Sequence, residues 1–153
     1  MIHRAYVGVG SNLGDPEANV RDAIAALGEL GAVERTSSLY RTKAWGKTDQ
    51  PDFVNAVALL ETGMSPRALL TALKAIETSL GRVPSERWGP RAIDLDILTF
   101  DDLHIEDDGL AIPHPHMAER AFVLVPLTEI DGSFATVRDR LPVEDIDACK
   151  ALD

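Results

Sequence analysis

The chain has 153 residues, of which 45% are hydrophobic and 26% are charged, and this composition excludes an intrinsically disordered protein. Its 15 Lys and Arg residues face 25 Asp and Glu residues, and the net charge of -10 disfavours nucleic acid or an anionic membrane as the main partner. The length predicts one domain over residues 1–153. Because Cys149 is the only cysteine, and no leader or membrane-spanning run is evident, we expect a cytoplasmic monomer.

The first half of the chain predicts three strands and one helix. Residues 5–10 form the first strand, and a turn follows before a helix that Asp15 caps and Pro16 begins. The second strand is expected at residues 32–40 and the third at residues 53–60, where β-branched and apolar residues dominate. Glycines after residue 27 end the helix between the first two strands.

A second helix and a fourth strand complete a recognisable order. Ser65 and Pro66 repeat the cap signal, and the helix that follows carries an apolar stripe of Leu69, Leu73, Ile76 and Leu80. Residues 92–100 predict the fourth strand. The order βαββαβ is that of a ferredoxin-like α+β sandwich, with two helices on one face of an antiparallel sheet. Beyond it we expect C-terminal additions, namely a short hairpin or edge strand at residues 101–108 and short helices within 118–130 and 142–152.

The fourth strand contains an unusual alternation. Ile93, Leu95 and Ile97 share one face, and Asp94 and Asp96 share the other. One interpretation is a polar face that simply contacts water. The other is a metal site, because carboxylates two residues apart lie roughly 7 Å from each other along a strand and can converge on magnesium, which accepts one or two carboxylates together with phosphate oxygens.

Other motifs leave alternatives open. Gly8-Val-Gly10-Ser-Asn-Leu-Gly14 is close to a dinucleotide fingerprint, but the third glycine comes one position late, so that a tight turn is the competing interpretation. The His114-Pro-His116 pair could bind zinc, although no cysteine lies nearby, and hydrogen bonds to an anion or to neighbouring backbone are the alternative.

Single residues raise similar questions. Glu77 is one position away from the apolar stripe of the second helix, and its simplest interpretation is a solvated glutamate. Trp45 and Trp88 belong to loops, and each either packs on the core or closes over a ligand.

Several motifs together resemble one family. They occur in the family's order from about residue 5 to residue 130, and they include Gly10-Ser-Asn-Leu-Gly14, Ser38-Leu-Tyr-Arg-Thr42, Gln50-Pro-Asp-Phe-Val-Asn-Ala56, Glu77 with Gly81-Arg82, Arg87-Trp-Gly-Pro-Arg-Ala-Ile-Asp-Leu-Asp-Ile-Leu98, Pro113-His-Pro-His-Met117 and Arg120-Ala-Phe-Val-Leu124. The chain is similar in these segments to 6-hydroxymethyl-7,8-dihydropterin pyrophosphokinase, an enzyme of folate biosynthesis.

The resemblance implies transfer of an intact pyrophosphoryl group from ATP to the hydroxymethyl group of the pterin, with release of AMP. It implies that Asp94 and Asp96 hold two magnesium ions, bound together with ATP, and that Arg82 and Arg91 act with them in catalysis. The implied ATP contacts are Glu77, Arg82, Trp88, Arg91, Ile97, His114 and Arg120. The implied pterin contacts are Phe53 and Phe122 as stacking rings, Asn55 as a hydrogen-bonding amide, and Thr42, Ala44 and Trp45 mainly through backbone.

The chain also departs from the family. Phe53 stands where the family often has tyrosine, which keeps the stacking ring and drops a hydroxyl. Pro84 stands where many members have a loop arginine, and His116 where arginine is frequent, so that fewer arginines are available to contact phosphate. Two rival functions remain from the sequence. One is a non-catalytic nucleotide- or pterin-binding module, and the other is a magnesium-dependent phosphohydrolase that would not need the planar-ring pocket.

Overall fold

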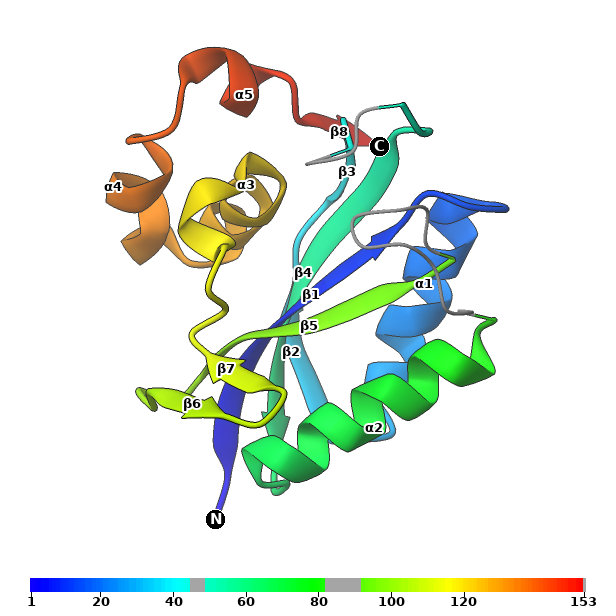
Figure 1. The fold of residues 1–153 in the computed structure, drawn as a ribbon, viewed down its shortest axis with the longest axis vertical. Helices are drawn as coiled ribbons and strands as arrows, with labels where there is room; N and C mark the ends of the chain where they lie inside the picture. The colour runs from blue at the N-terminus through cyan, green and yellow to red at the C-terminus, as the bar shows by residue number, and fades with distance from the viewer. Residues whose placement is uncertain (45–48, 82–91, 153) are drawn as a thin grey trace.

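The computed structural model describes residues 1–44, 49–81 and 92–152. These residues form one unit that combines helices with a β-sheet (Figure 1). The ferredoxin-like core comprises β1 (His3–Ser11), α1 (Pro16–Leu27), β2 (Ala32–Thr36), β3 (Leu39–Thr42), β4 (Phe53–Thr62), α2 (Pro66–Ser79) and β5 (Asp94–Phe100). The antiparallel sheet has the order β5-β1-β4-β3-β8, where β8 is the C-terminal strand Lys150–Leu152, and β2 also pairs with β4. The predicted α+β architecture with a ferredoxin-like sheet is therefore confirmed.

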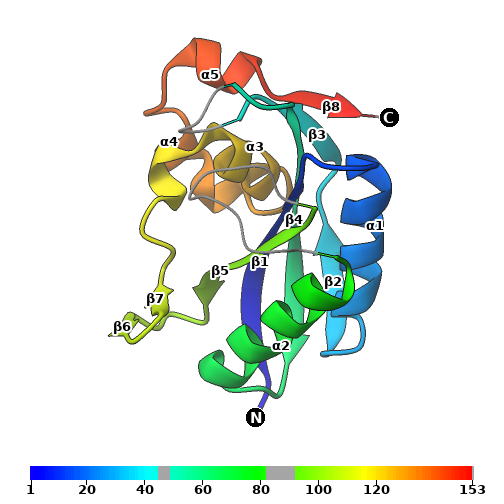
Figure 2. The same ribbon diagram turned by 45° about the vertical axis from the view of Figure 1, so that its right-hand side comes forward.

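The two faces of the sheet are covered by different parts of the chain (Figure 2). On one face, α1 and α2 pack Leu27, Leu69 and Leu73 against apolar residues of β1, β4 and β5. The other face packs against the segment around α3 (Ala121–Ile130), whose Leu124 and Leu127 are fully buried. Each face thus has its own apolar cluster, and the sheet is buried between two layers.

The predicted helix starts are confirmed at the level of single hydrogen bonds. The Asp15 carboxylate accepts from the Ala18 amide, and the Ser65 hydroxyl accepts from the Ala68 amide, each at 3.2 Å. A proline follows each cap. These caps satisfy amides that the first turn of a helix leaves without intrahelical partners.

The second predicted strand is divided in the structure, so the single strand over residues 32–40 is wrong in this detail. The division lies at Ser37 and Ser38, between β2 and β3. The Ser37 hydroxyl accepts from the Val57 amide at 2.9 Å, and the Glu129 carboxylate accepts from the Ser38 amide at 3.0 Å. Side chains here replace part of the ladder, which periodicity alone does not indicate.

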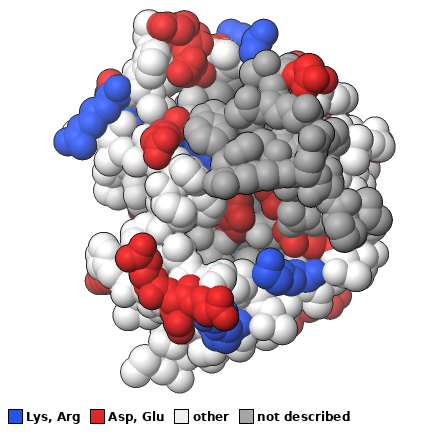
Figure 3. All heavy atoms as spheres, in the orientation of Figure 1, with Lys and Arg blue, Asp and Glu red and all other residues white. Residues whose placement is uncertain are grey.

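The C-terminal additions agree with expectation in outline. The hairpin consists of β6 (Ile105–Asp107) and β7 (Leu110–Ile112), and Figure 3 shows acidic side chains gathered over it. The Arg67 guanidinium ties this hairpin to α2 by donating to the Asp108 carbonyl at 2.7 Å. The remaining elements are two 3-10 turns, η1 (Met117–Glu119) and η2 (Gly132–Phe134), then α4 (Ala135–Arg138), α5 (Val143–Asp147) and an unpredicted strand, β8 (Lys150–Leu152), which pairs with β3.

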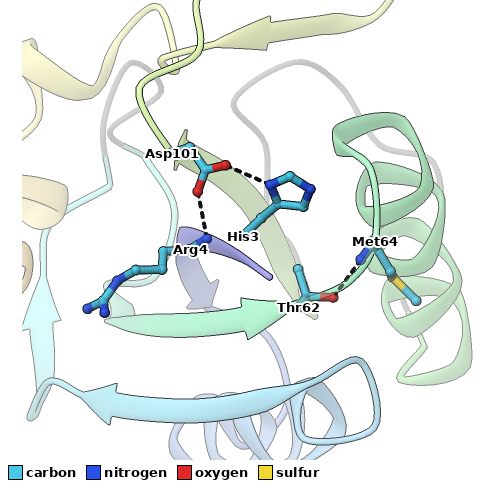
Figure 4. Close-up of polar contacts among 5 residues, drawn as sticks. All are labelled: His3, Arg4, Thr62, Met64 and Asp101. Atoms are coloured by element: carbon cyan, nitrogen blue, oxygen red, sulfur yellow. Dashed lines mark hydrogen bonds and ion pairs between the residues drawn. The ribbon is translucent and has the colours of Figure 1, made fainter. Parts of the chain in front are cut away.

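Polar contacts fix the end of the sheet at which β1 begins (Figure 4). The Asp101 carboxylate accepts from the Arg4 amide at 2.8 Å and contacts His3 Nδ1 at 2.6 Å, and these two contacts lower the pKa of Asp101. The Thr62 hydroxyl accepts from the Met64 amide at 3.2 Å. Gly10, near the opposite end of β1, lines the first of the two cavities described below. In the part of the chain that the structure describes, no helix has the length and apolar character needed to cross a membrane.

Candidate active site

Two cavities meet at the strand face that carries the aspartates. The first has a volume of about 340 Å³ and the second about 860 Å³. Asp94, Asp96 and His114 line both of them. As predicted, Leu95 and Ile97 of β5 are buried, as is Ile93 just before this strand, while both aspartates are partly exposed. The carboxylates therefore border both cavities. A polar strand face that only contacts bulk water would not need to border a cavity.

Two glycines of β1, Gly8 and Gly10, line the first cavity with bare backbone. Gly8 pairs with Asp96 on one side and Val57 on the other, and Gly10 pairs with Asp94 and Asn55. These glycines lie inside β1, so that neither the dinucleotide fingerprint nor the tight turn explains them; Gly14, with a φ of 67°, is the turn residue. A Cβ atom at Gly10 would collide with Asn55 Oδ1. The two glycines thus leave room above the sheet between the aspartates and Asn55.

The wall of the first cavity away from the aspartates suits a flat polar ring. Phe53 and Phe122 line it, and the buried Asn55 lies with them. Asn55 Nδ2 donates to Thr42 Oγ1 at 2.6 Å, which fixes the direction of the amide. The Thr42 side chain therefore orients the Asn55 amide, and the backbone contact that the resemblance implies for Thr42 stays a prediction. Ala44, two residues after Thr42, is buried. Lys43 lines the first cavity, although the sequence pattern did not identify it as a site residue.

His114 is held in a neutral form. Burial, reinforced by the charges of Arg120 and His116, lowers its pKa from 6.5 to about 4, although Asp94 opposes this shift. The His116 amide donates to His114 Nδ1 at 3.1 Å, and Nε2 lies 3.9 Å from Asp96 Oδ2. Since Nδ1 accepts, the ring proton of the neutral form is on Nε2, facing the aspartate. The backbone contact predicted for this His pair is confirmed; within the described residues no group of three or more potential ligands suits a metal ion.

Arg120 joins the two kinds of surface in the site. It is 5% exposed, and burial lowers its pKa while the charges of Asp96 and Asp94 raise it. Its guanidinium carbon lies 5.3 Å from the centre of the Phe122 ring. The planar guanidinium lines the cavity beside two carboxylates and stacks on an aromatic ring, and its fork of donors is suited to the oxygens of a phosphate group.

Glu77 is buried, which corrects its interpretation as a solvated glutamate. It is 5% exposed, and its Oε2 accepts from the Leu95 amide at 2.7 Å. Glu77 lies one turn after Leu73, so that helical spacing from that residue was the available signal. Together with Ile97 and Lys74, Glu77 lines the second cavity.

Pro84, to which no role is assigned, lies outside the described residues, and so do four predicted site residues, namely Trp45, Arg82, Trp88 and Arg91. Their predicted roles as phosphate or pterin contacts stay predictions, and so does the question of whether the tryptophans pack or close over a ligand. The described members of the predicted site line one or both cavities, except Thr42 and Ala44, which line neither.

The sequence is similar to one protein family and to individual proteins from several organisms. The family model for 7,8-dihydro-6-hydroxymethylpterin-pyrophosphokinase matches residues 6–132. The chain is 46% identical over 145 residues to the 2-amino-4-hydroxy-6-hydroxymethyldihydropteridine pyrophosphokinase of Methylorubrum extorquens, covering 90% of this chain and 91% of that protein. It is 47% identical over 132 residues to the protein of the same name from Bacillus subtilis, covering 85% and 79%.

Solved structures share the fold. Wild-type HPPK-DHPS of Plasmodium falciparum, crystallised with pteroate, matches with a TM-score of 0.71 at 15% identity, over 92% of this chain and 42% of that one. The A437G form with STZ-DHP gives a TM-score of 0.72 at 15% identity, over 92% and 45%. The chain therefore spans less than half the length of these structures, and the likeness concerns the fold alone.

Proposed function

The chain belongs to the 7,8-dihydro-6-hydroxymethylpterin-pyrophosphokinase family, a pyrophosphokinase of folate biosynthesis, and we propose that its reaction takes place where the two cavities meet. The reaction transfers the pyrophosphoryl group of ATP to the hydroxymethyl oxygen of 6-hydroxymethyl-7,8-dihydropterin and releases AMP. The single observation that supports this placement best is that Asp94 and Asp96 line both cavities. A donor in one cavity and an acceptor in the other would then meet at the carboxylates.

The pterin occupies the smaller cavity in this proposal. Its volume is within the range of small-ligand sites, and its walls combine apolar rings with a few directed polar groups. Phe53 and Phe122 stack on the two faces of the ring system. The Asn55 amide, oriented by Thr42, pairs with the polar edge of the pterin because it can donate and accept at once. The bare backbone of Gly8 and Gly10 lets the flat ring approach the sheet.

ATP occupies the larger cavity, between α2 and the β6–β7 hairpin. Ile97 and His114 line this cavity, and Arg120 lies in the neighbouring one beside the aspartates. Arg120 contacts the transferred phosphates, and its planar fork of donors matches their oxygens. The neutral His114 donates through Nε2 to an oxygen without adding a charge. Arg82, Trp88 and Arg91 complete the ATP contacts in this proposal, as the family resemblance implies.

Two magnesium ions fit the donor set at Asp94 and Asp96. Both carboxylates are on one strand face and open to both cavities, and magnesium in nucleotide sites uses one or two carboxylates together with phosphate oxygens and water. When bound, such ions neutralise charge on the triphosphate and polarise the phosphorus under attack. The contribution of the chain is to hold the two carboxylates in place and to exclude water around the meeting point. The cytoplasmic location and monomeric state stay predictions.

One assay tests the function. The protein is incubated with ATP, magnesium and 6-hydroxymethyl-7,8-dihydropterin, and AMP and the pterin diphosphate are measured. We expect both products in equal amounts, and none without pterin. Release of ADP or inorganic phosphate without pterin would instead indicate a phosphohydrolase, and tight binding of both ligands without products would indicate a binding module. For substitutions of Asp94 or Asp96, the matched control is Asp102→Asn, which changes an exposed aspartate beyond β5 and should stay active.

A further inference from the structure

A buried carboxylate of α2 contacts the edge of the strand that carries the aspartates. Glu77 is 5% exposed, and its Oε2 accepts from the Leu95 amide at 2.7 Å. Leu95 is the residue between Asp94 and Asp96. The contact therefore lies on the short piece of backbone that both aspartates share.

The position of β5 in the sheet explains why this amide is open to a side chain. In the described sheet β5 is an edge strand that pairs with β1 alone. Amides along one side of an antiparallel edge strand point away from its partner and need another acceptor. Glu77 supplies that acceptor at Leu95, at the point where α2 crosses the edge and packs Leu73 into the same core as Leu95.

A carboxylate is a costly group for this structural task. Burying a charge is unfavourable unless hydrogen bonds compensate for the lost water. An apolar residue would continue the stripe formed by Leu69 and Leu73, and the chain instead has the one acidic residue of α2 there. The bond to the Leu95 amide is a charge-assisted bond, which is stronger and more directional than a neutral one.

We propose that Glu77 is a positioning residue, which holds the Leu95 backbone and thereby sets the directions in which Asp94 and Asp96 point. This inference rests on the proposed function, since it assumes that the two aspartates bind magnesium with ATP. It assigns Glu77 a role different from the direct nucleotide contact implied by the family resemblance. Successive strand residues point to opposite faces, so a rotation of the Leu95 peptide groups turns both flanking side chains.

The test compares three variants with different hydrogen-bonding ability. Glu77→Gln keeps a carbonyl oxygen that can accept from the Leu95 amide, Glu77→Ala removes it, and Glu29→Gln removes one negative charge at an exposed position after α1. Hydrogen exchange of the Leu95 amide is followed by NMR without ligands. Mn²⁺ binding is then titrated in the presence of α,β-methylene-ATP, in which the bond that would break is replaced. Finally kcat and the KM for ATP are measured.

If Glu77 positions β5, the Leu95 amide exchanges about 10-fold faster or more in Glu77→Ala, in keeping with loss of one buried hydrogen bond. Mn²⁺ affinity falls by about 10- to 100-fold, as is usual when a partner behind metal ligands is removed. The loss appears in kcat more than in the KM for ATP. Glu77→Gln retains protection and metal affinity within a few-fold of wild type, and Glu29→Gln matches wild type.

Two results would overturn the proposal. One is unchanged Leu95 exchange in Glu77→Ala, and the other is a Glu77→Gln variant that keeps Leu95 protected but raises only the KM for ATP, as a direct nucleotide contact would. If Glu77→Ala does not fold, the Mn²⁺ affinity of Glu77→Gln decides. An affinity within a few-fold of wild type supports the proposal, and a larger loss contradicts it. Amide exchange requires no turnover, so a wild-type protein that made no AMP would contradict the proposed function without affecting this part of the test.

Discussion

Gly10 is the position where the structure makes the sharpest prediction. An alanine there places its Cβ against Asn55 Oδ1, and the Asn55 amide must move to avoid it. That movement disturbs the bond from Asn55 Nδ2 to Thr42 Oγ1, which is 2.6 Å long and buried. Gly8, two residues earlier on the same face, is the matched control, because an added Cβ would meet Leu98 Cδ2 at 3.4 Å, an ordinary contact.

The magnitude follows from two opposing effects. Crowding a packed interior costs about 1–3 kcal/mol. Replacing glycine by alanine restricts the unfolded chain and returns about 0.4–1 kcal/mol. We therefore expect Gly10→Ala to lower the free energy of unfolding by about 1–2 kcal/mol, and to lower Tm by about 2–8 °C in a domain of this size. Gly8→Ala should change the free energy of unfolding by less than about 1 kcal/mol.

Function should respond more than stability at Gly10. Because the displaced Asn55 amide no longer meets the pterin edge, we expect pterin affinity to fall by about 10-fold or more, with ATP affinity nearly unchanged. Urea unfolding gives the stability change, and pterin fluorescence titration gives the affinity. Equal stability of the two alanine variants, together with unaltered pterin affinity in Gly10→Ala, would refute the role assigned to this glycine.

Three further predictions concern single side chains of the site. Asp94→Asn or Asp96→Asn should abolish AMP formation while circular dichroism shows an intact fold; near-normal turnover would contradict the two-metal assignment. Phe53→Ala should weaken pterin binding by about 10-fold or more through lost stacking, and an equal loss of ATP affinity in calorimetry would argue against a pterin contact. Burial lowers the pKa of His114 from 6.5 to about 4, so the unfolded chain binds this proton more tightly than the folded one, and the free energy of unfolding falls as the pH drops from 6.5 toward 4. Urea titrations of His114→Asn should show a weaker loss over that window, and an unchanged pH dependence would exclude His114 as its source.

Local signals in the sequence were sufficient for most of the fold. The caps at Asp15 and Ser65 and the apolar stripe of α2 predicted helix positions directly, because these are short-range effects. The break between β2 and β3 was missed because it depends on Glu129, about ninety residues further along the chain. The strand β8 was missed for the same kind of reason, since pairing with β3, not its own sequence, makes it a strand.

The site was predictable in its residue types but not in its orientation. Alternation placed Asp94 and Asp96 on one face, and the structure adds the second cavity that they line. Gly8 and Gly10 fall within the strand predicted over residues 5–10, but a glycine pattern does not reveal which side chains lie beside it. Helical spacing from Leu73 indicates that Glu77 can be buried, but it does not indicate the partner, because that partner is a backbone amide and leaves no trace in side-chain patterns.

The acidic character of the chain constrains how an anionic nucleotide can bind. Glu77, Asp94 and Asp96 line the larger cavity together with the acidic hairpin, and Lys74 is the one lysine or arginine among its described lining residues. With a pKa of about 4, His114 adds no positive charge near neutral pH. A triphosphate entering alone would therefore meet a field of like charge. Two divalent cations at Asp94 and Asp96 would outweigh those two carboxylates and reverse the local sign. The net charge of -10, which disfavours nucleic acid, is thus compatible with ATP if ATP binds together with its metal ions.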